Sequence, residues 1–384
     1  MTIVLTGGGT GGHITPVLAI ANELKRLRPD ARVVYIGQKG DKLSDIPAQH
    51  PAIDAVYGVR AGKFRRYQGE GWKQVFDVPT QVKNLRDAFR VFVGIWQSYW
   101  LLRRLHPGII FTRGGYVSVP VAIAGKLRGI PYITHDSDST PSLANRLIAR
   151  WALLHAVALP PELYPYPKVK TVMVGVPVAE EYQPVSKKLQ HQYREELGLA
   201  AISHILLATG GGNGARDLNK LVVRSAPELL ADFPGLVIVH IAGRSLEEET
   251  VKAYDESLDA AVRSRAIVRG FVGDLYRYSG AADIIVARAG ATGLAEWAVQ
   301  GKACIVIPAP QLVWQSHHAS VLAKEHAVIM LDEKAATSGD RLTQAVSDLI
   351  ERTDRRSELA GRLASLSRPD AARQVAMLLL EKSR

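Results

Sequence analysis

The sequence predicts an α/β protein built from two doubly wound domains, and three observations predict it. Short, almost entirely apolar strands alternate with helical stretches, which is typical of parallel sheets that helices cover on both faces. A glycine-rich loop follows the first strand of each half of the chain, at 7–12 and at 210–214. The length of 384 residues also suits two domains.

Eight apolar segments form the predicted strands, and they divide evenly between two halves. They are 3–5, 33–36, 109–111, 132–134, 205–208, 237–241, 284–286 and 304–307. We expect the first domain to span 1–178 and the second 179–384, with the hinge in the stretch from 174 to about 195 and the last helix packing back on the first domain. The single cysteine, Cys304, rules out an intramolecular disulfide and is predicted to be a buried strand residue.

The charge balance favours anionic partners. There are 48 Lys and Arg against 37 Asp and Glu, a net charge of +11, which suits phosphates, nucleic acid or an acidic membrane surface. No zinc-binding spacing and no RNA-binding aromatic motif is present, so we expect no nucleic-acid partner. We also see no signal peptide and no run of roughly 18 apolar residues that could span a membrane, and expect a cytoplasmic protein.

The segment 6–13 reads Thr-Gly-Gly-Gly-Thr-Gly-Gly-His, directly after the first strand. Its five glycines allow a ligand to approach the backbone closely. A helix is expected from Thr15, with Pro16 in its first turn. A strand, a glycine loop and a helix N-terminus together predict a phosphate site, the alternative being a simple tight turn. His13 adds a titratable group that holding a phosphate does not require.

Two further polar segments follow strands of the first half. Thr112-Arg113-Gly114-Gly115-Tyr116 offers an arginine that could pair with a phosphate, or one that is merely exposed in a strand-to-helix turn. His135-Asp136-Ser137-Asp138 follows the next strand and either faces a ligand or caps a helix.

The second half repeats the arrangement. Its loop 210–216 precedes a predicted helix, and Arg288-Ala-Gly-Ala-Thr-Gly-Leu-Ala-Glu296 follows another strand. Glu296 could accept hydrogen bonds from two vicinal hydroxyls, or be a surface glutamate. No Asp-x-Asp pair follows a strand here, so we expect no metal at a diphosphate. The amides of 211–215 and 291–294 are the expected phosphate donors.

An aromatic stripe begins at Leu85. Phe89, Phe92, Trp96 and Tyr99 fall on one helical face. Such a stripe is either core or, with basic neighbours, a membrane-surface patch. The basic neighbours in sequence are Lys63, Arg65, Arg66, Lys83, Arg86 and Arg90.

These motifs in combination resemble the MurG family of glycosyltransferases over nearly the whole chain. The resemblance rests on 8–13, 114–118, 210–216 and 288–296. It implies the GT-B fold, two Rossmann-like domains facing a cleft. It also implies metal-independent, inverting transfer of N-acetylglucosamine from UDP-GlcNAc to the muramoyl C4 hydroxyl of undecaprenyl-linked lipid I, giving lipid II. The reaction would take place at the cytoplasmic face of the membrane, with the protein bound peripherally.

The resemblance also implies site residues. His13 is the expected base that deprotonates the acceptor hydroxyl. Residues expected to contact the donor are Thr10, Gly11, Gly12, Asp138, Gly211, Gly212, Asn213, Gly214, Val272, Ala291, Thr292, Gly293, Leu294, Ala295, Glu296, Gln315 and Ser316. Residues expected to contact the acceptor are Gly8, Gly9, Arg113, Gly114, Gly115, Tyr116 and His135. The expected membrane patch is Phe89, Phe92 and Trp96.

Three other functions are compatible with the same motifs. A related glycosyltransferase would act on another lipid acceptor. A UDP-sugar epimerase would turn over the nucleotide sugar without an acceptor, and a non-catalytic sensor would bind UDP and release none.

Overall fold

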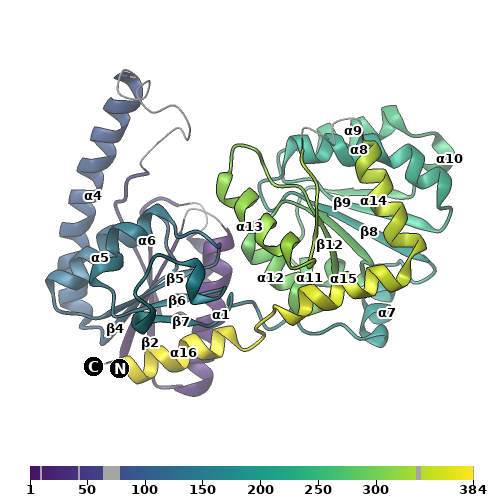
Figure 1. Ribbon diagram of the computed structural model, residues 1–384. Coiled ribbons are helices and arrows are strands. Elements are labelled where there is room, and N and C mark those ends of the chain that lie inside the picture. Colours follow the sequence, from purple (N-terminus) through teal and green to yellow (C-terminus); the bar gives the residue numbers. More distant parts are fainter. Residues whose placement is uncertain (9–10, 42–43, 64–77, 334–338, 384) are drawn as a thin grey trace. The chain divides into compact units, whose positions relative to one another are not determined.

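The protein divides into two compact units in a computed structural model (Figure 1). The structure describes residues 1–8, 11–41, 44–63, 78–333 and 339–383, apart from the side chains of 13, 78 and 79. Unit 1 comprises Met1–Ala179 and Pro369–Arg384, and unit 2 comprises Glu180–Arg368. The division along the chain thus lies next to the predicted 178/179 boundary, and the end of the chain belongs to unit 1.

The sheet of unit 1 has seven parallel strands in the order β3-β2-β1-β4-β5-β6-β7. The strands are β1 (Thr2–Thr6), β2 (Arg32–Gln38), β3 (Ala55–Val59), β4 (Ile109–Thr112), β5 (Tyr132–Asp136), β6 (Leu154–Val157) and β7 (Thr171–Met173). In the centre of the sheet Val4 pairs with Val34 on one side and Ile110 on the other.

The sheet of unit 2 is also parallel, with six strands in the order β10-β9-β8-β11-β12-β13. The strands are β8 (His204–Thr209), β9 (Leu236–Ile241), β10 (Ala266–Arg269), β11 (Ile284–Ala287), β12 (Ala303–Val306) and β13 (Ile329–Met330). All eight predicted strands are confirmed, and Cys304 is fully buried on β12 as predicted.

Helices lie on both faces of each sheet (Figure 1). Unit 1 has α1 (Gly11–Leu27), α2 (Asp45–Ala48), α4 (Val78–Leu105), α5 (Ser118–Leu127), α6 (Leu143–Ile148), α16 (Ala371–Lys382) and the 3-10 turns η1 (Ala149–Trp151), η2 (Pro161–Leu163) and η3 (Lys168–Lys170). Unit 2 has α7 (Lys187–Glu196), α8 (Arg216–Asp232), α9 (Glu247–Ser257), α10 (Ala260–Arg263), α11 (Leu275–Ala281), α12 (Ala291–Gln300), α13 (Val313–Lys324), α14 (Asp340–Glu351) and α15 (Thr353–Ser365).

The strands read as apolar throughout because both faces of each sheet are buried. In β8, Leu206 and Ala208 belong to one core, while Ile205 and Leu207 belong to the core on the opposite face. Successive side chains of a strand point to opposite faces, so a strand covered on both sides needs apolar residues at every position.

The strand order of each sheet reverses beside its first strand, between β1 and β4 and between β8 and β11. Loops that leave neighbouring strands in opposite directions open a crevice at the carboxyl edge, which is where doubly wound sheets bind ligands. The glycine loops predicted from the sequence leave β1, β4, β8 and β11 at this edge.

Helix α1 corrects one prediction. It begins at Gly11, not at Thr15, and Pro16 lies inside it. The sequence misled here because glycine is a poor helix residue and proline usually marks a first turn. The earlier start brings His13 into the helix itself, two residues from its beginning.

Helix α16 packs against α1 on one face of the first sheet (Figure 1). Val375 and Leu379 share a core with Val17 and Leu24. The end of the chain therefore completes the hydrophobic core of unit 1.

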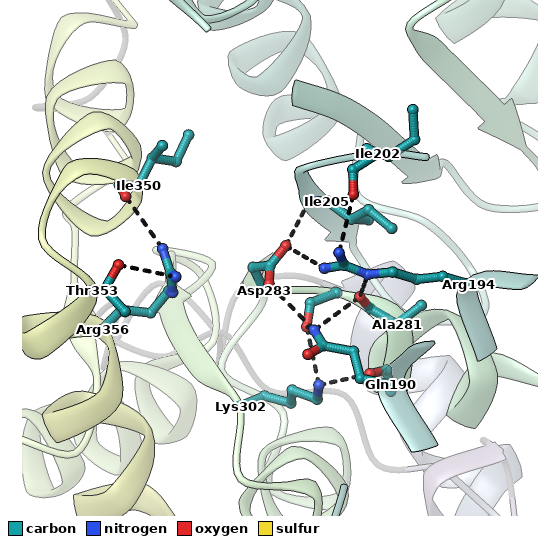
Figure 2. Close-up of polar contacts among 12 residues, drawn as sticks. Gln190, Arg194, Ile202, Ile205, Ala281, Asp283, Lys302, Ile350, Thr353 and Arg356 are labelled. Atoms are coloured by element: carbon teal, nitrogen blue, oxygen red, sulfur yellow. Dashed lines mark hydrogen bonds and ion pairs between the residues drawn. The ribbon is translucent and has the colours of Figure 1, made fainter. Parts of the chain in front are cut away.

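Helix α7 lies within the stretch that the sequence suggested as the hinge, so the segment between the units is shorter than predicted. Figure 2 shows the polar contacts between α7 and the amino end of the second sheet. Arg194 forms an ion pair with Asp283 at 2.7 Å, and Gln190 donates to the same carboxylate at 3.2 Å. Beside them the buried ammonium of Lys302 donates to the carbonyls of Gly280 at 2.7 Å and Ala282 at 3.0 Å.

Candidate active site

The glycine loops of unit 1 lie against each other at the carboxyl edge of its sheet. A Cβ atom on Gly115 would lie 3.1 Å from the carbonyl oxygen of Gly8. Gly114 and Gly115 have φ values of +83° and +81°, a left-handed conformation that favours glycine. The structure thus brings together the loops after β1 and β4, two of the segments predicted to meet the acceptor.

Arg113, Asp136 and Asp138 form a charged cluster at this edge. Burial lowers the pKa of Arg113 to about 10, opposed by its attraction to Asp138 and Asp136. Burial raises the pKa of Asp138 to about 6; Arg113 acts to lower it and Asp136 to raise it further. Arg113 is therefore buried beside carboxylates and is not the exposed arginine of a turn.

In the cluster 135–138 the structure supports the helix-capping role for Asp136, while the ligand-facing role stays a prediction for Asp138. Asp136 accepts hydrogen bonds from the amide of Ser142 at 3.1 Å, from Asn145 Nδ2 at 2.8 Å and from the Tyr166 hydroxyl at 2.7 Å. Ser142 in turn caps α6. Asp136 thus holds the start of a helix, whereas Asp138 keeps a half-buried side chain beside Arg113.

The structure corrects the role predicted for His135. Its side chain is fully buried, and Nε2 donates to the carbonyl oxygen of Gly175 at 2.9 Å. Burial lowers the pKa of His135 to about 3, with Arg113 acting in the same direction. This neutral, buried imidazole is bonded to the main chain and is not exposed to an acceptor, so we assign it to anchoring Gly175.

The other predicted residues of unit 1 divide between described and undescribed parts. The Tyr116 hydroxyl donates to Gln38 Oε1 at the end of β2, so the tyrosine borders the same edge. Gly9 and Thr10 lie outside the described residues, as does the side chain of His13. The main chain places Gly11, Gly12 and His13 in the first turn of α1.

The loop after β8 is shaped by close backbone contacts. Gly211 and Gly214 have φ values of +85° and +74°. A Cβ atom on Gly214 would lie 2.2 Å from the Ala242 carbonyl oxygen, so only glycine fits there. Gly211, Gly212 and Asn213 are exposed, which leaves the tip of the loop open to a ligand.

Fewer amides are available for a phosphate than the sequence suggested. The amide of Gly211 donates to Thr209 Oγ1 at 3.2 Å, and that of Gly214 donates to the Gly211 carbonyl at 2.8 Å. On α12, the amide of Leu294 donates to Gly290 at 3.1 Å, as a helix continues. These donors are engaged within their own segments, so the candidate donors narrow to Gly212, Asn213 and Ala215 in the loop and to Ala291 and Gly293 in the first turn of α12.

Glu296 lies in the second turn of α12 and is not a surface glutamate, since it is only 7% exposed. Burial raises the pKa of its carboxyl group to about 8, although a hydrogen bond with the Tyr182 hydroxyl acts in the opposite direction. Tyr182 also packs edge-on against Tyr276. No local pattern indicated Tyr182, because it lies near the start of unit 2, far from Glu296 in the sequence.

The remaining predicted donor residues also lie at the carboxyl edge of unit 2. Val272, half-buried, follows β10, and Ala295 lies beside Glu296 on α12. Gln315 and Ser316 are in the first turn of α13, where Gln315 Oε1 accepts from the Ala309 amide at 3.3 Å. The sequence did not predict the ion pair between Arg288 and Glu333. Arg288 Nη2 lies 2.6 Å from Glu333 Oε1, and this contact stabilises the segment before α12.

Helix α4 carries an exposed apolar face. Phe89, Phe92 and Trp96 are 64%, 68% and 63% exposed, so they are not core. The face also includes Val82, Leu85 and Trp100. Tyr99 departs from the prediction, because it is half-buried and packs with the core next to α5.

Basic side chains flank this face. Lys83, Arg86 and Arg90 are exposed on α4, whose first turns extend past α5 (Figure 1). Arg65 and Arg66 lie outside the described residues. Among the described helices, none is long and apolar enough to cross a membrane.

Comparison with known proteins agrees with this geometry. Residues 3–156 match the glycosyltransferase family 28 N-terminal domain, and residues 205–375 match the glycosyltransferase family 28 C-terminal domain. A relative from Moorella thermoacetica is 31% identical over 99% of both chains. It is named UDP-N-acetylglucosamine–N-acetylmuramyl-(pentapeptide) pyrophosphoryl-undecaprenol N-acetylglucosamine transferase, and a Bacillus pumilus relative of the same name is 32% identical over 99% of both chains.

The chain belongs to the MurG family. The crystal structure of Acinetobacter baumannii MurG has the same fold, with a TM-score of 0.73 at 24% identity and 99% coverage of both chains. The GT-B fold predicted from the sequence is thereby confirmed. The C-terminal family model extends to residue 375, so it includes part of α16, which packs in unit 1.

Proposed function

We propose that this protein is an inverting glycosyltransferase that moves N-acetylglucosamine from UDP-GlcNAc to the muramoyl C4 hydroxyl of lipid I, forming lipid II. The observation that carries the proposal is the match of 99% of the chain to relatives named for this transfer. The glycine loops at both carboxyl edges support it, because each offers a site that a phosphate-bearing ligand could occupy.

The donor would bind to unit 2. The tip of the loop at 212–213 and the start of α12 carry amides suited to the diphosphate. Glu296 would take the two ribose hydroxyls, and the backbone of Val272 would meet the uracil. Gln315 and Ser316, in the first turn of α13, would hold the sugar.

The acceptor would bind to unit 1. His13 would remove the proton from the C4 hydroxyl, whose oxygen then attacks the anomeric carbon of the donor sugar from the face opposite UDP. The bond from that carbon to the diphosphate oxygen breaks, and the amides of unit 2 would stabilise the charge that develops on UDP. Arg113, which lies beside Asp138, would bind the acceptor diphosphate.

We also propose that transfer needs no divalent metal. Among the described residues, no group of three or more His, Cys, Asp or Glu could hold one. The charge of the leaving group would instead meet helix N-termini. Initial rates with a soluble acceptor should survive EDTA, and loss of activity that magnesium restores would contradict this part of the proposal.

Helix α4 would bind the anionic surface of the membrane that holds lipid I. Its exposed aromatic face and basic neighbours have the composition of an interfacial helix. The protein would then act peripherally at the cytoplasmic face.

The decisive experiment measures UDP release from UDP-GlcNAc with and without a lipid I analogue. A transferase releases UDP only with the acceptor, and the product carries a new glycosidic bond at C4. Turnover without acceptor would favour an epimerase, and tight UDP binding with no turnover would favour a sensor.

A further inference from the structure

A chain of four buried polar side chains runs through the interior of unit 2. It runs from Tyr254 on α9 through His240 on β9 to Asn219 on α8, and Asn219 also bonds to Thr250 on α9. All four residues are at most 4% exposed. The mechanism above uses none of them, yet a fully paired polar chain in an apolar core is costly to assemble and specifies one arrangement.

The donors in this chain can be assigned without ambiguity. Asn219 Nδ2 lies 2.9 Å from the Ala242 carbonyl oxygen, which can only accept, so Oδ1 is the atom that faces His240. His240 Nε2, 3.1 Å from Oδ1, must therefore carry the proton. Nδ1 is then the acceptor, and the Tyr254 hydroxyl donates to it at 3.0 Å. Burial lowers the pKa of His240 to about 3, which keeps the ring in this neutral form.

Thr250 completes the pairing. It receives the second proton of Asn219 Nδ2 at 3.3 Å and donates its own to the Leu246 carbonyl at 2.7 Å. The Tyr254 hydroxyl and His240 Nε2 thus both donate in the direction of Asn219. The Asn219 amide in turn donates to the Ala242 carbonyl and to Thr250, which donates to the Leu246 carbonyl. Reversing the Asn219 amide would set its oxygen against the Ala242 oxygen, so the arrangement is locked.

The chain ends at the main chain that supports the glycine loop. Ala242 and Gly243 follow β9 and lie directly against Gly214. A Cβ atom on Gly243, whose φ is +100°, would lie 2.4 Å from the Gly214 Cα atom. Contact this close leaves no space between the two segments, so the position of Ala242 fixes the position of Gly214.

We propose that Tyr254, His240 and Asn219 are positioning residues for the diphosphate of the nucleotide, acting through Ala242 and Gly214. This inference rests on the proposed function, since it assumes that the loop 210–214 holds the diphosphate. It goes further by assigning a role to residues that touch no ligand. The Ala242 carbonyl orients the Asn219 amide, Asn219 Oδ1 sets the tautomer of His240, and the Tyr254 hydroxyl donates to the remaining ring nitrogen. Together the three side chains hold the main chain on which the loop rests.

The test compares two ligands, UDP and uridine, which share the base and the ribose and differ in the diphosphate. The dissociation constant of uridine divided by that of UDP isolates what the phosphates contribute to affinity. In Asn219→Ala the ratio should fall about tenfold, and in Tyr254→Phe about two- to fourfold, within the range of one lost hydrogen bond. The affinity for uridine should stay unchanged in both.

Ser225→Ala is the matched control. Ser225 is buried on the same helix as Asn219, and its hydroxyl bonds to the carbonyls of Leu221 and Gly339, away from the loop. This variant should lose stability without changing the ratio. Nitrogen NMR of His240 should show a proton on Nε2 in the unaltered protein and in Tyr254→Phe, and a shift toward Nδ1 in Asn219→Ala, where the Tyr254 hydroxyl can accept it.

Each outcome decides between the hypotheses. If Tyr254→Phe and Asn219→Ala weaken both ligands equally, or neither, the positioning role is wrong and the chain serves stability alone. If Asn219→Ala does not fold, Tyr254→Phe, which keeps the ring volume, carries the test. If the unaltered protein binds UDP no tighter than uridine, the proposed diphosphate site itself is wrong.

Discussion

The carboxyl edges of the two sheets differ in chemistry although their strand orders match. In unit 1 the edge carries charged side chains, with Arg113 buried beside Asp136 and Asp138. In unit 2 it carries mainly backbone, which is exposed at the tip of the loop after β8 and buried or half-buried at the start of α12. The same topology thus presents different groups at its two edges, side chains in one unit and main chain in the other.

Replacing His13 with alanine should have the largest effect on turnover. It tests whether unit 1 acts through its side chains. Loss of a general base lowers turnover about a hundred- to ten-thousandfold. Affinity for UDP should stay unchanged, because the nucleotide is expected on unit 2. Steady-state kinetics with a lipid I analogue, beside calorimetry with UDP, separates the two. A collapse of UDP binding with intact turnover at saturation would make His13 a ligand-positioning residue.

The double change Phe89→Ser and Phe92→Ser tests whether unit 1 also uses side chains toward a membrane. Each exposed ring that becomes buried contributes about 1.5–3 kcal/mol, so binding to anionic vesicles should fall about a hundredfold or more. Flotation with vesicles measures it. Leu127→Ser with Leu147→Ser is the control, because these residues are exposed on α5 and α6. A lower melting temperature instead would show that the two rings stabilise the fold.

Changing Glu296 to alanine tests the one side chain that is expected to bind the ribose of the nucleotide at the carboxyl edge of unit 2. Hydrogen bonds to a charged group are worth about 1.5–3 kcal/mol, so UDP affinity should fall roughly ten- to a hundredfold. Calorimetry on the folded variant checks this. An unchanged affinity would mean that main-chain contacts hold the nucleotide alone.

The raised pKa of Glu296 sharpens the same prediction. With a pKa of about 8, the free protein carries mostly the protonated acid at pH 7. Two ribose hydroxyls would favour the carboxylate, so UDP binding should release up to one proton near neutral pH. Calorimetry in buffers of different ionisation enthalpy measures this release. Glu296→Gln should release none from this position, and equal release by both proteins would refute the assignment.

Replacing Lys302 with methionine should give the smallest effect and leave both edges untouched. Burial lowers the Lys302 pKa to about 8, below its unfolded value, so the unfolded chain binds more protons above pH 8. The unfolding free energy should therefore rise with pH from 8 to 9.5, by about 1–2 kcal/mol, and Lys302→Met should lack this rise. Urea titrations at several pH values test it. Parallel curves for the two proteins would contradict it.

The sequence was sufficient for the central strands and the loops that leave them. Strands such as 3–5 and 284–286 are buried on both faces, so every position signals burial. The edge strands β3, β7, β10 and β13 were missed because they are short or half-exposed, and their pattern is weak. The inner strand β6 was missed although it is almost fully buried, because it has only four residues. The glycine loops were predictable because left-handed or crowded backbone requires glycine.

The side-chain partners in the site could not be predicted. His135 was expected to meet a ligand, and only the fold shows that Gly175 lies within hydrogen-bond distance. The contact of Tyr182 with Glu296 joins residues far apart in the chain, and no local pattern encodes such a pair. The number of free amides also depended on turn geometry, since Gly211 and Gly214 use theirs within the loop.

The packing of α16 in unit 1 has a consequence for biosynthesis. Unit 2 is one continuous segment, whereas unit 1 needs residues from both ends of the chain. During synthesis on the ribosome, α1 therefore lacks its packing partners Val375 and Leu379 until after all of Glu180–Arg368 has been made. Since domains fold during synthesis as their residues emerge, the unit that begins first should finish last. Proteolysis of chains stalled before residue 369 should find unit 2 protected and α1 still open to cleavage.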